Sequence, residues 1–228
     1  MAFHSLQTSL TYQPQVLEFG TSGRRGKVVD LTQLEVFINA LAELEYLQTL
    51  SLSKGGIVRG EEFYFGRDLR PSSYAFVPEE EGRGEIAQAI VSAIHQAGMI
   101  PVNLGAIPTP AVMCYAIARG KGSIMVTGSH IPFDRNGYKT NSSCGELMKY
   151  QEAPILEQVG LVRERIYSQS AGESLFNERG QFKTGHQELP PEHPDARAAW
   201  IDRFTNFFHR ATLAGKRLLV YQHSAVGR

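Results

Sequence analysis

The chain has 228 residues, and its 23 Lys and Arg residues balance its 23 Asp and Glu residues. Zero formal net charge argues against non-specific binding to nucleic acids or to membrane surfaces. The N-terminus lacks a basic start followed by an apolar core, and no apolar run approaches the ~20 residues that cross a bilayer. Cys114 and Cys144 have no metal-site spacing with the histidines, and two such cysteines favour the reducing cytoplasm over a disulfide scaffold.

The N-terminal part of the chain predicts a loose arm followed by a helix and a strand. Residues 1–15 are polar and are interpreted as the arm. The helix begins at Thr32, which can form a capping box with Glu35, and apolar side chains then recur at helical spacing as far as Leu47. Residues 62–65 indicate a strand that a glycine ends.

Two more helices and two more strands are predicted further along the chain. Residues 86–97 show helical spacing of Ile and Ala before a glycine stops the pattern. Residues 100–104 predict a strand, and Pro101 places it at a strand start or at a sheet edge. Thr109 is expected to cap a short helix with proline at its first position, and residues 123–127 form the next predicted strand.

This alternation of helices and strands is typical of an α/β domain with a largely parallel sheet. Ligands of such sheets gather at the carboxyl ends of the strands. Three glycine-bearing loops lie beside the predicted strands, at residues 20–26, 66–73 and 128–139. We therefore expect these loops to converge on one site.

The C-terminal part differs in composition from the rest of the chain. Residues 171–195 are rich in Gly, Glu, Gln, His and Pro and predict a surface loop or linker. A helix is expected at 194–211 with its aromatic residues on one face, and residues 217–221 indicate a buried strand. We interpret residues 196–228 as the start of an incomplete second domain.

The sequence TGSHIPFDRNGYK at residues 127–139 carries the strongest signal for chemistry. Ser129 follows an apolar strand on a tight turn, where a hydroxyl is an exposed nucleophile. His130 can accept its proton, and Lys139 can bind an anionic group beside it. An ordinary turn uses many of the same residue types, but the complete pattern indicates group transfer at Ser129, with phosphate as the transferred group.

Two other glycine-bearing motifs accompany the serine loop. In FGTSGRRG, residues 19–26, small residues leave backbone N–H groups accessible to an anion and two arginines add charge. A glycine-rich turn with solvated arginines explains this motif equally well, and it is not a P-loop, since Val28 stands where Ser or Thr would hold magnesium. In GRDLR, residues 66–70, the Arg-Asp pair either braces a neighbouring loop or forms a surface ion pair; we favour the brace.

Together these motifs resemble those of the α-D-phosphohexomutases, the family of phosphomannomutases and phosphoglucomutases. FGTSGRRG is similar to the family's N-terminal signature, GRDLR to its second motif, PTPAV at residues 108–112 to its third, and TGSHIPFDRNGYK to its phosphoserine loop. Residues 217–228 are similar to the first strand and turn of the family's second domain. The resemblance implies a three-layer α/β/α fold with a mixed, largely parallel sheet, in which residues 16–170 are the first of four domains.

The resemblance also implies a mechanism and a set of site residues. Ser129 would carry a phosphoryl group, donate it to a hexose 1- or 6-phosphate, and recover the other phosphate from the hexose 1,6-bisphosphate. Arg25 would hold the phosphoserine, His130 and Lys139 would serve proton transfer and charge stabilisation, and Mg²⁺ would bind the phosphoserine oxygen. The other residues expected to contact phosphate are Thr21, Ser22, Gly23, Arg24, Asn136 and Gly137.

The sequence departs from the family pattern in two places. Residue 131 is Ile where the family usually has Asn, and the sequence contains no Asp-Gly-Asp-x-Asp-Arg magnesium loop. Because that loop belongs to the family's second domain, we expect this chain alone to lack mutase activity. The serine loop favours a phosphomannomutase, while a phosphoglucomutase, a phosphoglucosamine mutase and a non-catalytic phosphosugar-binding module stay open as alternatives.

Overall fold

The structure, a computed structural model, describes residues 4–208, 213–222 and 225–227. Its centre is a six-stranded sheet with the order β1-β7-β6-β2-β5, and β8 pairs with β7 beside this path. The strands of this sheet are β1 Arg24–Lys27, β2 Glu62–Arg67, β5 Ile100–Ala106, β6 Ser123–Val126, β7 Arg135–Ser142 and β8 Gly145–Glu146. A separate two-stranded ribbon joins β3 Phe76–Val77 and β4 Arg83–Gly84.

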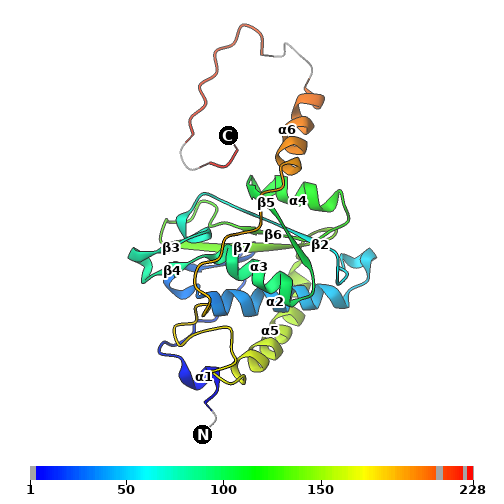
Figure 1. Ribbon diagram of the computed structural model, residues 1–228. Helices are drawn as coiled ribbons and strands as arrows, with labels where there is room; N and C mark the ends of the chain where they lie inside the picture. Colours follow the sequence, from blue (N-terminus) through cyan, green and yellow to red (C-terminus); the bar gives the residue numbers. More distant parts are fainter. Residues whose placement is uncertain (1–3, 209–212, 223–224, 228) are drawn as a thin grey trace.

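Helices cover both faces of the sheet, which gives the predicted three-layer α/β/α arrangement (Figure 1). On one face α2 packs against α3 and α5, whereas α4 lies on the other face against β2 and β6, with α6 beyond it. The α-helices are α1 Leu6–Ser9, α2 Gln33–Thr49, α3 Ile86–Gln96, α4 Thr109–Ile117, α5 Glu152–Tyr167 and α6 Asp195–Phe207. Single-turn 3-10 helices lie at Val28–Asp30, Leu52–Lys54, Pro71–Ser73, Pro78–Glu80 and Lys149–Gln151. None of the described helices has both the length and the apolar character to cross a membrane.

The sheet is mixed, as predicted, and its parallel part comprises three strands. β2 pairs in parallel with β5 and with β6, whereas β7 runs antiparallel to β6, β1 and β8. Pro101 lies in β5, which is an edge strand as expected. β1 and most of β7 lie in stretches that were predicted to be loops. The apolar pattern does not mark β7, because this strand buries polar residues such as Asn136 and Thr140.

Local sequence signals place the starts of two helices. The Thr32 hydroxyl accepts the Glu35 N–H at 3.2 Å, so α2 has its predicted cap. The reciprocal half of the capping box is not formed, because the Glu35 carboxylate instead accepts the Tyr167 hydroxyl of α5 at 2.6 Å. The cap of α4 is Pro108, and Thr109 is the first residue of the helix. The predicted cap at Thr109 is therefore wrong by one residue, since Pro108 has the extended backbone that a cap position requires.

Two segments that were predicted to be loosely attached are packed into the domain. Leu6 of α1 is fully buried in the core next to α5, so the loose-arm prediction is wrong for this helix. Phe176 and Phe182, within the predicted linker at 171–195, are also buried and pack edge-on against Phe37 of α2. Burial of large apolar side chains outweighs the freedom that a loose segment would keep, which explains both corrections.

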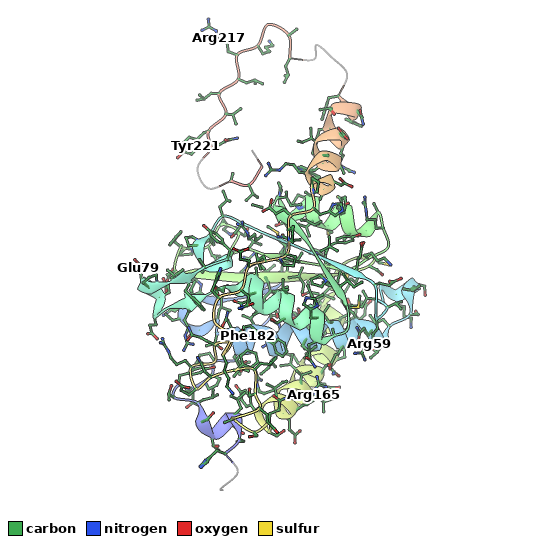
Figure 2. All side chains as sticks on the ribbon, in the orientation of Figure 1. Arg59, Glu79, Arg165, Phe182, Arg217 and Tyr221 are labelled. Atoms are coloured by element: carbon green, nitrogen blue, oxygen red, sulfur yellow. The ribbon has the colours of Figure 1, made fainter. Side chains whose placement is uncertain are left out.

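The C-terminal segment differs most from its predicted form. α6 begins at Asp195, and its predicted end lies outside the described residues. Residues 217–221 form no strand, and Leu219 is 96% exposed, so the prediction of a buried strand is wrong for this segment. Figure 2 shows Arg217 and Tyr221 on an extended segment that lies apart from the sheet. Among the described residues no strand pairs with it, and an extended segment needs such a partner to become a strand.

Candidate functional site

Ser129 follows β6 in a turn that exposes its side chain. Its backbone φ of 55° lies in the left-handed region, which costs a residue with a side chain about 1–2 kcal/mol. Strained residues of this kind persist only where their surroundings hold them, and they cluster at active sites. The turn therefore presents the Ser129 hydroxyl to solvent, in the position predicted for a nucleophile.

The carboxylate of Asp68, which follows β2, holds the serine turn. Its Oδ2 accepts the Thr127 hydroxyl at 2.9 Å and the Gly128 N–H at 3.1 Å. Thr127 Oγ1 in turn accepts the Ser129 N–H at 2.9 Å. The other oxygen of Asp68 accepts the Ser73 hydroxyl at 2.7 Å. Oδ2 thus joins the carboxyl ends of β2 and β6, while the other oxygen holds the segment that follows β2.

The guanidinium of Arg70 holds the rest of the serine loop through backbone carbonyl groups. Its Nη1 donates to Pro132 O at 2.8 Å and to Arg135 O at 3.0 Å. Its Nη2 donates to Ile131 O at 2.5 Å and to Ser129 O at 3.3 Å. The prediction that the GRDLR motif braces a neighbouring loop is therefore confirmed. Residues 66–73 and 128–139 converge, as expected.

The imidazole of His130 contacts the Ser129 hydroxyl. Its Nδ1 lies 3.3 Å from Ser129 Oγ, and both side chains are exposed. An imidazole at this distance can exchange a proton with an oxygen at the serine position, in a direction that depends on its tautomer. A hollow of about 410 Å³ opens beside Ser129, and its walls include Thr109, Phe133 and Val226. This volume is in the range of small-molecule sites.

Arg25 and Lys139 lie on the same face of the sheet. Arg25 pairs with Gly137 across β1 and β7, and Lys139 is two residues further along β7. Since side chains alternate along a strand, residues two apart share a face. Lys139 also pairs with Met125, which belongs to the apolar cluster on the α4 side. Both cations are partly exposed, and the Lys139 ammonium lies 3.7 Å from the Glu146 carboxylate.

The loop that contains Thr21, Ser22 and Gly23 lies beside Lys139, and together they line a cavity of about 40 Å³. Gly23 has a φ of 75°, and a Cβ atom there would lie 2.3 Å from Tyr138 O, so glycine allows the close approach of this loop. The structure thus brings predicted phosphate-contacting residues together with Lys139. In the described part of the chain, however, Ser129 lines a different hollow, so the convergence of all three loops is only partial.

Arg24, which was also expected to contact phosphate, is fully buried. Its Nε donates to the Glu43 carboxylate at 2.6 Å, and its Nη1 donates to the Leu17 carbonyl. Burial alone would lower the pKa of Arg24, but the Glu43 carboxylate raises it above its usual value. Strand alternation turns Arg24 into the core, whereas its neighbour Arg25 faces the other side. The phosphate contact of Arg24 stays a prediction, which its burial does not favour.

Two further predicted phosphate contacts are internal as well. The Asn136 amide donates to the Ser72 and Ser73 hydroxyl groups at 2.8 and 3.0 Å, and Asn136 is fully buried. Gly137 lies so close to β1 that a Cβ atom would be 2.0 Å from Arg24 O. The contacts of Asn136 and Gly137 with phosphate stay predictions, which the burial of Asn136 and the close packing of Gly137 do not favour.

The described residues do not supply a complete magnesium site. No group of three or more His, Cys, Asp or Glu side chains in this part of the chain is arranged to hold a metal ion. Both oxygens of Asp68 accept N–H or O–H donors of the protein, and Mg²⁺ needs several oxygen ligands in octahedral geometry. The Mg²⁺ that the resemblance implies therefore does not fit these residues alone.

Curated relatives of the chain are sugar-phosphate mutases. A phosphomannomutase of Sinorhizobium fredii (strain NBRC 101917 / NGR234) is 33% identical over 211 residues, and one of Salmonella muenchen is 32% identical over 219 residues. These alignments cover 92% and 93% of this chain but only 39% and 37% of the relatives. A phosphoglucosamine mutase of Helicobacter acinonychis (strain Sheeba) is 30% identical, over 70% of this chain and 33% of its own length.

A solved structure has the same fold. A protein of Thermus thermophilus, described as a candidate phosphomannomutase, matches with a TM-score of 0.54 at 19% identity, over 86% of this chain and 37% of its own. This chain thus spans well under half the length of these relatives. Residues 16–160, which include Arg25, Ser129 and Lys139, match the family described as phosphoglucomutase/phosphomannomutase, alpha/beta/alpha domain I. The sequence resemblance is confirmed, and the chain belongs to the phosphoglucomutase/phosphomannomutase family.

Proposed function

We propose that the protein is a phosphohexomutase that interconverts hexose 1-phosphate and hexose 6-phosphate through a phosphoserine at Ser129 and a hexose 1,6-bisphosphate. The observation that carries this proposal is the exposed Ser129 hydroxyl, held at a φ of 55° by a network anchored on Asp68. The phosphomannomutase relatives favour mannose phosphate as substrate. The phosphoglucosamine mutase relative makes glucosamine phosphate the second candidate.

The proposed reaction has two phosphoryl transfers of opposite direction. In the first, the bond between phosphorus and Ser129 Oγ breaks, a bond from phosphorus to a sugar hydroxyl oxygen forms, and the hydroxyl proton passes to His130. In the second, the bisphosphate has turned round. The bond between its other phosphorus and the sugar oxygen breaks, a bond from that phosphorus to Ser129 Oγ forms, and His130 returns the proton to the sugar oxygen. Arg25 and Lys139 supply positive charge for the phosphoryl oxygens, which is the main catalytic requirement of such transfers.

We propose further that the complete protein uses Mg²⁺ as its cofactor and acts in the cytoplasm. The ion would need the phosphoserine oxygen together with carboxylates beyond those that the described residues supply, and EDTA is expected to abolish turnover while the fold persists. The free cysteines Cys114 and Cys144 support a reducing compartment. For the 228-residue chain alone we expect labelling of Ser129 without multiple turnovers.

The direct test is transfer of phosphate to Ser129. The complete protein is incubated with glucose 1,6-bisphosphate and its peptides are mapped by mass spectrometry. We expect one phosphate on Ser129 and none in the Ser129→Ala variant; undiminished labelling of that variant would overturn the proposal. Coupled assays with mannose 1-phosphate, glucose 1-phosphate and glucosamine 6-phosphate then assign the sugar. Binding of these compounds without labelling or turnover would favour a non-catalytic phosphosugar-binding module.

A further inference from the structure

A buried carboxylate lies beneath the strands that carry the two proposed phosphate-binding cations. Glu43 of α2 is 1% exposed and accepts three side-chain donors. The Arg24 Nε donates at 2.6 Å, the Thr140 hydroxyl at 2.5 Å and the Tyr138 hydroxyl at 3.4 Å. Burial, and next the Glu43 carboxylate, raise the pKa of Tyr138 well above its usual value, so its phenol remains a neutral donor.

Each of these three donors is a direct neighbour of a proposed phosphate-binding cation. Arg24 precedes Arg25 in β1, and Tyr138 and Thr140 stand on either side of Lys139 in β7. Because alternate residues of a strand point to opposite faces, a single carboxylate on the α2 side anchors the backbone from which both cations project on the other side.

Stability alone does not account for this arrangement. Replacing a buried ion pair with apolar residues of similar volume is often neutral or stabilising, so Glu43 is not required merely to fill the core. The Arg24 Nη2 also has no hydrogen-bond partner in the described structure. Arg24 lines the small cavity of about 40 Å³ together with Lys139 and Gly23. The hydrogen bonds of Glu43 therefore lie where β1, β7 and the loop at residues 20–23 meet.

We propose that Glu43 is a positioning residue, which fixes the register and orientation of β1 and β7 so that Arg25 and Lys139 reach the transferring phosphoryl group. The inference rests on the proposed function of the Ser129 site. Small displacements of groups that orient a reaction reduce its rate by about 10- to 100-fold. Glu43 is buried and also lines the small cavity beside Lys139, but it touches none of the reacting atoms in this proposal.

The test compares Glu43→Gln with Glu35→Gln in the complete protein. Glu35 is a matched control, because it is a fully buried carboxylate of the same helix, but its partners Arg163 and Tyr167 belong to α5. We expect Glu43→Gln to lower kcat by about 10-fold or more with little change in KM, and Glu43→Asp to restore part of the loss. Glu35→Gln is expected to lower the melting temperature without changing kcat of the folded fraction.

Two further variants keep the test decisive if Glu43→Gln folds poorly. Thr140→Val removes one donor to Glu43 at nearly constant volume, and we expect it to lower kcat about threefold or more at a normal KM. In a Lys139→Ala background, Thr140→Val is expected to lower kcat by a smaller factor than in the wild type, because one of the two cations that the hydrogen bonds of Glu43 position is already absent. Unchanged kcat in folded Glu43→Gln and in Thr140→Val would overturn the inference. Failure of the proposed function is distinguishable, because it appears as continued phosphate labelling of Ser129→Ala.

Discussion

The carboxylate of Asp68 accepts the hydroxyl of Thr127 at 2.9 Å, although 59 residues separate the two in the chain. The bond joins residues that follow the adjacent parallel strands β2 and β6. Because Thr127 Oγ1 also accepts the Ser129 N–H at 2.9 Å, the conformation of the serine turn depends on a residue from another strand. The predicted nucleophile is thus positioned by strand pairing as well as by its own loop.

Replacement of Asp68 by asparagine is expected to loosen the serine turn. An amide keeps only one acceptor oxygen, so either the Thr127 and Gly128 donors or the Ser73 donor loses its partner. We expect Asp68→Asn to reduce the free energy of unfolding by about 1–3 kcal/mol and to slow phosphate labelling of Ser129. Urea denaturation and the labelling rate measure both effects. Asp134→Asn, at an exposed position of the same loop, should leave both unchanged.

The left-handed backbone at Ser129 predicts an unusual order of stability among its variants. At a φ of 55° an alanine retains the strain of a side chain, whereas a glycine does not. We expect the free energy of unfolding of Ser129→Gly to exceed that of Ser129→Ala by about 1 kcal/mol. Neither variant is expected to accept phosphate. The difference is measured from the midpoints of urea denaturation, provided that both variants have the same dependence of the free energy of unfolding on urea concentration. Equal stability of the two variants would show that the turn is unstrained in solution.

Gly137 is expected to tolerate no side chain. A Cβ atom would lie 2.0 Å from the Arg24 carbonyl oxygen, a backbone atom that cannot move without separating β1 from β7. We expect Gly137→Ala to lower the free energy of unfolding by about 2 kcal/mol or more. Gly160→Ala serves as the control, because this helical glycine of α5 has open space around its Cβ position. The control should gain up to about 1 kcal/mol from its higher helix propensity.

Arg25→Ala and Lys139→Ala are expected to reduce turnover by about 10²-fold or more and to change the melting temperature little. The only ion pair found for Lys139 among the described residues is a partly exposed contact of 3.7 Å with Glu146, and such pairs contribute about 0–1 kcal/mol. A coupled mutase assay and thermal denaturation of the complete protein measure both effects. Lys121→Ala, which removes a similar pair with Glu61 at 2.7 Å, should change neither. Loss of folding with normal specific activity would instead assign Arg25 or Lys139 a structural role.

The elements that could be predicted from the sequence are those with a regular apolar period. α2 and α3 follow their Leu and Ile spacing, and β2, β5 and β6 follow short apolar runs. α5 was missed, although Ile155, Val159, Val162 and Ile166 recur at helical spacing and are buried. The order of four motifs was enough to indicate the family. Such signals are local, because the period of a helix or strand is set by its own backbone geometry.

The sequence also indicated the serine turn, the GRDLR brace, and the cations Arg25 and Lys139 of the loops at 20–26 and 128–139. The roles of Ser129, His130, Arg25 and Lys139 stay predictions. Only the tertiary structure decided which of these motif residues face the site. Arg24 and Arg25 are identical in type and adjacent, yet one is buried against Glu43 and the other is partly exposed. Their orientation follows from the register in which β1 pairs with β7, where Arg24 stands opposite Tyr138. That register is fixed by contacts between segments far apart in the chain, and by a carboxylate on a third element, so no local pattern in the sequence contains it.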